Sequence, residues 1–240
     1  MSKNKKITFS IISVILILTL VICVVLLSAD FGSDALDTTY NAEKRIKMNV
    51  YASQNLKAEQ GQIVFIGDSI TELFEFEKYY TDLPLKIYNR GIIGDTADKM
   101  FERLETNCLN ANPSKIFMLV GVNDLNRGFS AQTIVENITK SVVKAQTDVP
   151  EAKIFVQSIY PVNPNKNKKI VSNRTNNDIA KINALLKTMC NDRGVTFIDT
   201  YALLYDEQQQ NLALELTLDG LHLNFNGYTK VSKFLLPYLI

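Results

Sequence analysis

The chain has 240 residues, of which 46% are hydrophobic and 21% charged, and its formal net charge is +1. This length suits one folded domain with an appendage, and the composition excludes a disordered or low-complexity chain. The near-neutral charge argues against nucleic acid as the main partner.

The first predicted element is an apolar segment near the N-terminus. No charged residue occurs from Ile7 to Ala29. A helix of roughly 21 apolar-dominated residues within this run would be about 30 Å long, which matches the hydrocarbon thickness of a bilayer. Residues 1–29 are therefore predicted to form a cytoplasmic N-terminus and a transmembrane helix. The lysines before this run and the aspartates after it predict a single-pass protein of the cell membrane whose remaining chain is extracytoplasmic.

A cleaved signal peptide, which would leave a secreted protein, is the alternative for this segment. The run is longer than the usual apolar core of a signal peptide, and Leu27-Ser28-Ala29 is a poor cleavage site. These two features favour an uncleaved anchor.

Residues 30–60 contain many helix-forming and charged residues and predict a helix that leads into the domain, with a turn at Gly61. Residues 61–240 contain no internal repeat and no linker, so they are predicted to form one domain. Three domain segments are therefore expected, with boundaries at 1–29, 30–60 and 61–240.

Short apolar runs alternate with helical patterns through the predicted domain. The runs are rich in β-branched and aromatic residues and predict strands at Ile63–Ile66, Leu85–Tyr88, Ile116–Val120, Ile154–Ile159 and Val195–Ile198. Helical patterns occupy residues 95–109, 131–147, 173–192 and 227–238. This alternation predicts a parallel five-stranded sheet between two helical layers, which is a three-layer α/β/α sandwich of the α/β class.

Small and polar residues follow the predicted strands. Gly67-Asp68-Ser69 follows the first strand, Asn89–Thr96 the second and Gly121–Asp124 the third, while Asp219–His222 precedes the last helix. Ligands of an open parallel sheet bind beyond the carboxyl ends of its strands, so these segments are expected to converge on one site.

Ser69 and His222 are the candidate nucleophile and general base. A serine hydroxyl needs a base to become nucleophilic, and His222 is the only histidine in the chain. Asp219 precedes it by a spacing that puts two side chains on one face of a helical turn, where the carboxylate could orient the imidazole. The backbone N–H groups of Ser69 and Gly94 and the side-chain amide of Asn123 are candidate oxyanion-hole donors.

Each of these motifs also has a purely structural interpretation. Gly-Asp-Ser is a common turn tripeptide, Asp-x-x-His fits a capped turn before a helix, and Asn123 fits a turn residue at a strand end. Asp68 and Asp124 are interpreted as residues that hold their loops. The basic segment Asn165–Lys169 fits a solvated loop better than a site for an anionic substrate.

The ordered set GDS, NRGIIGDT, GVND and DGLH resembles the blocks of the SGNH or GDSL hydrolase family over about residues 61–238. The closest branch is that of platelet-activating-factor acetylhydrolase and bacterial acyl esterases. The resemblance implies a flavodoxin-like fold without metal or cofactor. It also carries the family's catalytic and oxyanion-hole positions onto Ser69, Gly94, Asn123, Asp219 and His222. No Gly-x-Ser-x-Gly elbow is present.

These observations predict a serine esterase that forms an acyl-enzyme on the outer face of the membrane. The resemblance implies a short acyl group such as acetyl, carried by a small ester or an acylated glycan or lipid. An O-acyltransferase acting on a cell-wall sugar polymer with the same residues is the alternative, and a non-catalytic surface binding module is a second one. The cysteines form no CxxC pair, so no zinc site is expected, and Cys108 and Cys190 are predicted to be buried free thiols.

Overall fold

The computed structural model describes residues 32–240, so the predicted transmembrane helix lies outside the described residues. The chain divides into two compact units, Met1–Ile46 and Lys47–Ile240. Helix α2 (Gly32–Asn55) fulfils the prediction of a helix between residues 30 and 60, and Gly61 turns the chain with a φ of +74°. Within residues 32–240, no helix has the length and apolarity needed to cross a membrane.

The second unit is built on a parallel sheet of five strands in the order β2-β1-β3-β4-β5. The strands are β1 (Ile63–Gly67), β2 (Ile87–Gly91), β3 (Lys115–Leu119), β4 (Lys153–Gln157) and β5 (Thr196–Ile198). All five predicted strands are present, although β2 begins and ends later than predicted. This is the flavodoxin-like order, in which the direction of winding reverses between β1 and β3 and leaves a crevice at their carboxyl ends.

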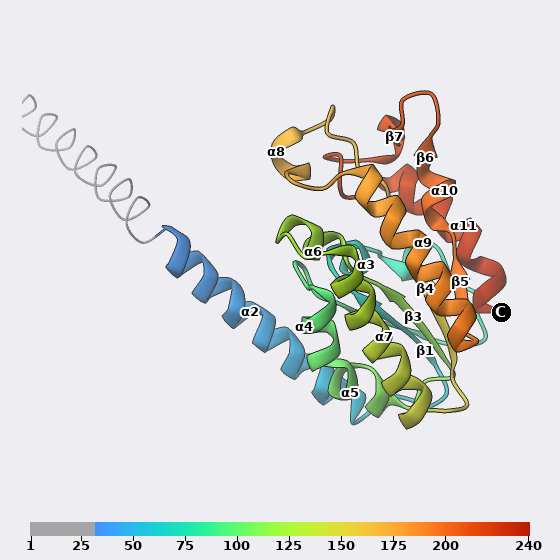
Figure 1. The fold of residues 1–240 in the computed structure, drawn as a ribbon. Helices are drawn as coiled ribbons and strands as arrows, with labels where there is room; N and C mark the ends of the chain where they lie inside the picture. The colour runs from blue at the N-terminus through green and yellow to red at the C-terminus, as the bar shows by residue number, and fades with distance from the viewer. Residues whose placement is uncertain (1–31) are drawn as a thin grey trace, which may run out of the picture. The chain divides into compact units, whose positions relative to one another are not determined.

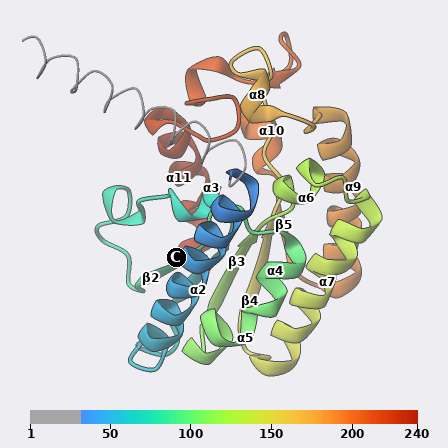
Figure 2. The same ribbon diagram turned by 90° about the vertical axis from the view of Figure 1, so that its left-hand side faces the viewer.

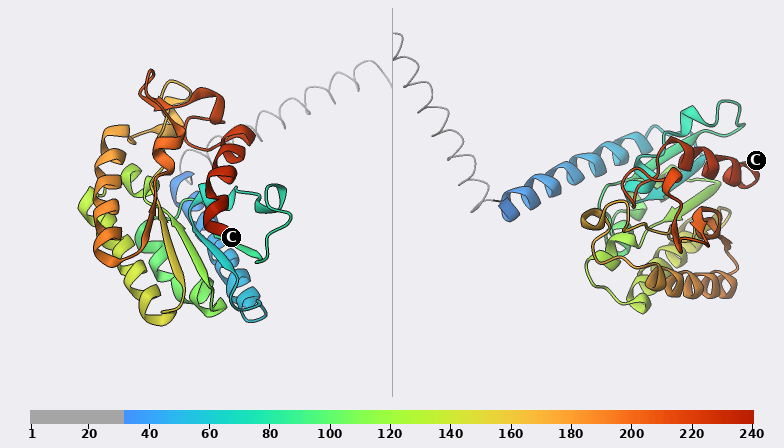
Figure 3. Two further views of the ribbon diagram at one scale, coloured as in Figure 1. Left: turned by 90° about the vertical axis from the view of Figure 1, so that its right-hand side faces the viewer. Right: turned by 90° about the horizontal axis from the view of Figure 1, so that it is seen from above.

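Helices cover both faces of the sheet, which confirms the three-layer prediction. The described helices α4 (Ala97–Glu102), α7 (Ala131–Asp148) and α9 (Asn176–Arg193) lie along one face (Figure 1). Helix α11 (Phe225–Leu239) lies on the other side of the strands (Figure 3). The helix predicted at 95–109 is divided into α4, α5 (Leu104–Asn107) and the 3₁₀ turn η2 (Leu109–Ala111), with a break at Arg103.

An aromatic row fills the core between the sheet and α11. Phe65, Phe117 and Phe155 occupy the same register position on β1, β3 and β4, and their rings stack at centroid distances of 4.3 and 4.5 Å. Phe76 packs on Phe65, and Tyr238 of α11 meets Phe155 edge-on. The residues of β1 are all buried, as expected for a strand covered on both faces.

Several short elements follow the strands and were not predicted (Figure 2). They are α3 (Ser69–Glu72), η1 (Phe76–Lys78), α6 (Val122–Asn126), α8 (Lys168–Val171), α10 (Thr200–Leu204), η3 (Leu214–Leu216) and the antiparallel pair β6 (Tyr205–Asp206) and β7 (Asn211–Leu212). Because each has only two to five residues, none produces a readable hydrophobic period.

Cys108 and Cys190 are buried free thiols, as predicted. Burial raises the pKa of both thiols to about 12. Neither side chain is therefore a reactive thiolate at neutral pH.

Candidate active site

Ser69 stands where β1 turns into α3. Asp68 is the N-cap of this helix, and its carboxylate accepts the Ile70 N–H at 3.0 Å. A Cβ atom at Gly67 would lie 2.1 Å from the carbonyl oxygen of Leu119, so only glycine lets β1 lie this close to β3 at its carboxyl end. The tight turn leaves Ser69 5% exposed, at the β1–β3 crevice.

His222 connects Ser69 to Asp219. Its Nε2 lies 3.0 Å from the Ser69 hydroxyl, and its Nδ1 lies 2.8 Å from an Asp219 carboxylate oxygen. Although burial opposes ionisation, hydrogen bonds from His222 and Leu221 hold the pKa of Asp219 below its ordinary value. An ionised carboxylate only accepts hydrogen bonds, so the neutral imidazole carries its proton on Nδ1 and Nε2 can accept the Ser69 proton.

The loop that carries Asp219 and His222 is not the helical turn that the spacing suggested. It is closed by an antiparallel bridge between Thr217 and Leu223, and the Thr217 hydroxyl donates to the His222 carbonyl at 2.8 Å. The second carboxylate oxygen of Asp219 accepts the N–H groups of Leu221 and His222 at 3.0 and 2.8 Å. The aspartate therefore orders the loop and orients the imidazole at the same time.

The segment after β2, residues 92–95, forms a tight turn that we call the Gly94 loop. It is closed by a hydrogen bond from Asp95 N–H to the Ile92 carbonyl at 3.2 Å, and Gly94 has a φ of +72°. The Glu72 carboxylate at the end of α3 accepts the Ile93 N–H at 2.6 Å. Neither Gly94 N–H nor Ser69 N–H donates to any group in residues 32–240, so both are available to a ligand.

Asn123 lies in the first turn of α6, directly beyond β3. Its side-chain NH₂ donates to the Asp95 carbonyl at 3.0 Å, and its oxygen accepts from the Arg174 guanidinium at 3.0 Å. Since β2, β1 and β3 are neighbours in the sheet, the structure brings the three predicted oxyanion-hole donors to adjacent strand ends.

Buried carboxylates hold the loops around Ser69. Asp124 accepts the Ala97 N–H at 3.0 Å, which ties α6 to the start of α4. Burial raises the pKa of Asp68 to about 7 and that of Asp124 to about 6. Both carboxylates accept hydrogen bonds from backbone N–H groups, and these contacts support the interpretation that both residues hold loops.

A buried ion pair that the sequence pattern did not predict supports this region. Arg103 donates to Asp95 at 2.6 Å, and both side chains are fully buried. Its other nitrogens donate to the carbonyls of Arg90 and Gly67 at 2.8 and 2.9 Å, so it ties the ends of β1 and β2 to the Gly94 loop. An arginine within a helical pattern is usually exposed, so its spacing indicated nothing of this role.

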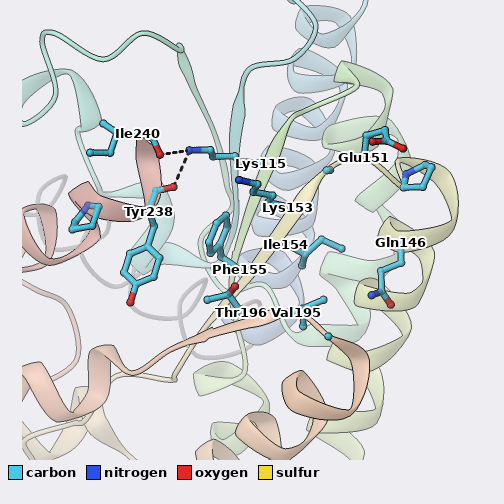
Figure 4. Close-up of a pocket in the computed structure, with 14 residues that line it drawn as sticks. Lys115, Gln146, Glu151, Lys153, Ile154, Phe155, Val195, Thr196, Tyr238 and Ile240 are labelled. Atoms are coloured by element: carbon cyan, nitrogen blue, oxygen red, sulfur yellow. Dashed lines mark hydrogen bonds between the residues drawn. The ribbon is translucent and has the colours of Figure 1, made fainter.

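A pocket of about 540 Å³ lies at the opposite edge of the sheet (Figure 4). Lys115 and Lys153 stand there, at the amino ends of β3 and β4. The Lys115 ammonium donates to the carbonyls of Tyr238, Leu239 and Ile240 at 3.1, 2.9 and 2.9 Å and so caps the end of α11. Because Ser69 follows the carboxyl end of β1, this pocket is not part of the candidate site.

In the part of the chain that is described, no cluster of three or more His, Cys, Asp or Glu side chains could hold a metal ion.

Comparisons with known proteins show which family the chain resembles. The model of the GDSL-like lipase/acylhydrolase family matches residues 65–230. The Homo sapiens platelet-activating factor acetylhydrolase IB subunit alpha2 is 30% identical over 181 residues, which cover 74% of this chain and 75% of that protein.

Solved structures share the fold. A protein of Streptococcus pneumonia named after platelet activating factor is 29% identical, with a TM-score of 0.82 over 88% of this chain and 99% of that one. An acetyl-xylooligosaccharide esterase from Geobacillus Stearmophilus, in a mutant form, is 17% identical, with a TM-score of 0.61 over 76% of this chain and 95% of that one. At this identity the second likeness concerns the fold alone.

Proposed function

The chain belongs to the GDSL-like lipase/acylhydrolase family and is a carboxylic ester hydrolase, and from this premise we propose that Ser69 is its nucleophile, His222 its general base and Asp219 the residue that orients the base. The observation that carries this proposal is the continuous hydrogen-bonded path from the Ser69 hydroxyl through both ring nitrogens of His222 to the Asp219 carboxylate, at 3.0 and 2.8 Å.

In the proposed reaction, the Ser69 oxygen attacks the ester carbonyl while His222 Nε2 takes the hydroxyl proton. The imidazolium then donates this proton to the leaving alcohol, which leaves an acyl group on Ser69. Water then attacks the acyl group on Ser69 with His222 again as the base, and the imidazolium returns the proton to the Ser69 oxygen as the acid is released. Asp219 stabilises the imidazolium in both steps.

The oxyanion of each tetrahedral intermediate is proposed to accept hydrogen bonds from Ser69 N–H, Gly94 N–H and the Asn123 amide. Two features support this assignment: the two backbone N–H groups have no partner within residues 32–240, and one Asn123 N–H remains after the bond to Asp95. Donors held in place before the reaction stabilise the developing charge without reorganisation.

The acyl group is proposed to be short, with acetyl as the first candidate. The relatives named as platelet-activating factor acetylhydrolases support this choice, because their name specifies removal of acetyl. The acyl carrier is proposed to be a small ester or an acylated glycan or lipid.

Turnover of p-nitrophenyl acetate tests the proposal. The change Ser69→Ala should abolish turnover and labelling by a fluorophosphonate probe while the protein stays folded. Ser130→Ala, which removes the hydroxyl of an exposed helix cap, is the matched control and should remain active. Retained turnover by the Ser69→Ala variant would refute the assignment of the nucleophile.

The same acyl-enzyme would serve an O-acyltransferase if an alcohol rather than water received the acyl group. Ester turnover in the presence of an added glycan separates the two reactions. Release of free acid at an unchanged rate supports hydrolysis, whereas faster appearance of acyl groups on the glycan would replace it with transfer.

We also propose that residues 7–29 anchor the domain to the outer face of the cell membrane. The support comes from the sequence, in the uncharged run between the N-terminal lysines and the aspartates from Asp30 onward. Resistance to carbonate extraction, together with digestion of the domain by protease added to intact spheroplasts, is expected. A protein released by carbonate would contradict the anchor.

A further inference from the structure

Arg174 is a buried cation that forms no ion pair within residues 32–240, and the carboxylates of Asp68 and Asp219 act on its charge only from a longer distance. Its side chain lies in the turn between α8 and α9 and is 8% exposed, and none of the ion pairs in that part of the chain includes it. A charge buried in this way is costly unless it is paired or serves a function. Arg103, by contrast, is paired with Asp95.

The guanidinium of Arg174 is aimed at the candidate site by a set of carbonyl groups. Its Nε donates to the Val122 carbonyl at 2.9 Å, and one terminal nitrogen donates to the carbonyls of Ile170 and Val171 at 3.1 Å each. The other terminal nitrogen donates to the Asn123 side-chain oxygen at 3.0 Å. Because all three nitrogens of the planar guanidinium donate hydrogen bonds, the direction of its hydrogen bond to the Asn123 oxygen is nearly fixed.

These contacts determine how the Asn123 amide is oriented. Its oxygen accepts from Arg174, and its NH₂ donates to the Asp95 carbonyl. If the amide were rotated by half a turn, its NH₂ would face the guanidinium donor and its oxygen would face the Asp95 carbonyl. Both contacts would be repulsive, so only the observed orientation is stable, and its second N–H points in a single direction.

We propose that Arg174 is a positioning residue for ester hydrolysis. It locks the Asn123 amide so that one amide N–H faces the oxyanion, and the positive charge of Arg174 polarises that N–H. This inference rests on the proposed function, in which Asn123 is an oxyanion-hole donor. Arg174 does not touch the substrate. Its effect should appear when negative charge develops, in kcat, and little in KM.

A double-mutant cycle on the full-length protein with p-nitrophenyl acetate tests the inference. Asn123→Ala should lower kcat by about 10²–10³-fold, as loss of one oxyanion-hole donor does. Arg174→Met should lower kcat by roughly tenfold or more, with KM within about twofold. The key expectation is that Arg174→Met has no further effect in the Asn123→Ala background, because the residue acts through the amide.

Two further variants control for charge and folding. Arg127→Gln removes an exposed cation at the end of α6, the helix that carries Asn123, and it should keep wild-type kcat. Arg174→Lys retains the charge but loses the fork of donors, so an intermediate kcat is expected. If Arg174→Met shows no cooperative unfolding transition, Arg174→Lys carries the test in both backgrounds.

The possible outcomes separate the inference from the proposed function. Equal loss from Arg174→Met in both backgrounds would overturn the inference, since Arg174 would then act on something other than Asn123. Wild-type kcat in a folded Arg174→Met variant would overturn it as well. Wild-type kcat in Asn123→Ala would refute the oxyanion-hole role of Asn123 and the inference together, while the Ser69→Ala result would still decide the nucleophile.

Discussion

Replacing Asp219 with asparagine should disable the proposed base while leaving its loop folded. In the native protein, one carboxylate oxygen accepts the N–H groups of Leu221 and His222 and the other accepts His222 Nδ1–H at 2.8 Å. The asparagine oxygen can still accept both backbone N–H groups. Its NH₂ must then face Nδ1 and donate to it, so the ring proton moves to Nε2, which can no longer accept from Ser69.

The size of the effect follows from what is lost. The charge-assisted hydrogen bond to the imidazolium contributes about 1.5–3 kcal/mol, and the wrong tautomer must also be reversed before each attack. A total of roughly 3–5 kcal/mol corresponds to a loss of about 10²–10⁴-fold in kcat. The Asp219 side chain is 24% exposed, so solvent screening places the expected loss towards the lower end of this range.

Hydrolysis of p-nitrophenyl acetate near pH 7.5 (about one pH unit above the ordinary histidine pKa) and thermal unfolding provide the two measurements. Asp199→Asn is a matched control, because the Asp199 carboxylate also accepts a backbone N–H, that of Ala202, as the N-cap of α10. It should keep full activity. Asp219→Ala should lose activity and also lower the melting temperature, since the loop loses its cap. An Asp219→Asn variant with activity within about threefold of the native enzyme would refute the proposed role.

Three further predictions concern the framework of the site. Gly67→Ala should destabilise the protein by about 3 kcal/mol or more in urea unfolding, because its Cβ would lie 2.1 Å from the Leu119 carbonyl oxygen. A Cβ at Gly128 would meet nothing within 4 Å, so the control Gly128→Ala should cost only about 1 kcal/mol for its φ of +80°. Equal losses of stability in the two variants would contradict this reasoning. Burial raises the pKa of Asp68 from 3.8 to about 7, so the folded protein holds this proton more tightly than the unfolded chain, and the stability due to this carboxyl is lost as pH rises from about 4 to 7. The advantage of Asp68→Asn over the native protein should therefore grow by up to about 4 kcal/mol across that range, and a difference independent of pH would refute it. Glu72→Gln should lower kcat by about three- to tenfold at unchanged KM, because a neutral acceptor holds the Gly94 loop less firmly, and a wild-type kcat would show that this contact is dispensable.

The predicted fold agreed with the structure where the sequence pattern was long enough to be read. The five strands were found because strands buried on both faces are continuous apolar runs. The predicted helix at 131–147 closely matches α7 (Ala131–Asp148), and the one at 227–238 lies within α11 (Phe225–Leu239). The predicted helix at 95–109 was less accurate, because its pattern does not reveal the break at Arg103, whose side chain turns inward to a buried ion pair.

The sequence by itself determined the candidate chemistry. A single histidine, a serine after the first strand and an asparagine after the third made Ser69, His222 and Asn123 candidates, because parallel strands bring their carboxyl ends to one edge. The resemblance of the ordered motifs to the GDSL family then favoured these candidates over a purely structural interpretation of each motif. The tertiary structure decided how these groups are held. The Asp219–His222 pair lies in a closed loop rather than on a helical turn, and Arg174 reaches Asn123 across 51 positions of the chain. Such contacts depend on strand order and loop packing, and no local spacing in the sequence encodes them.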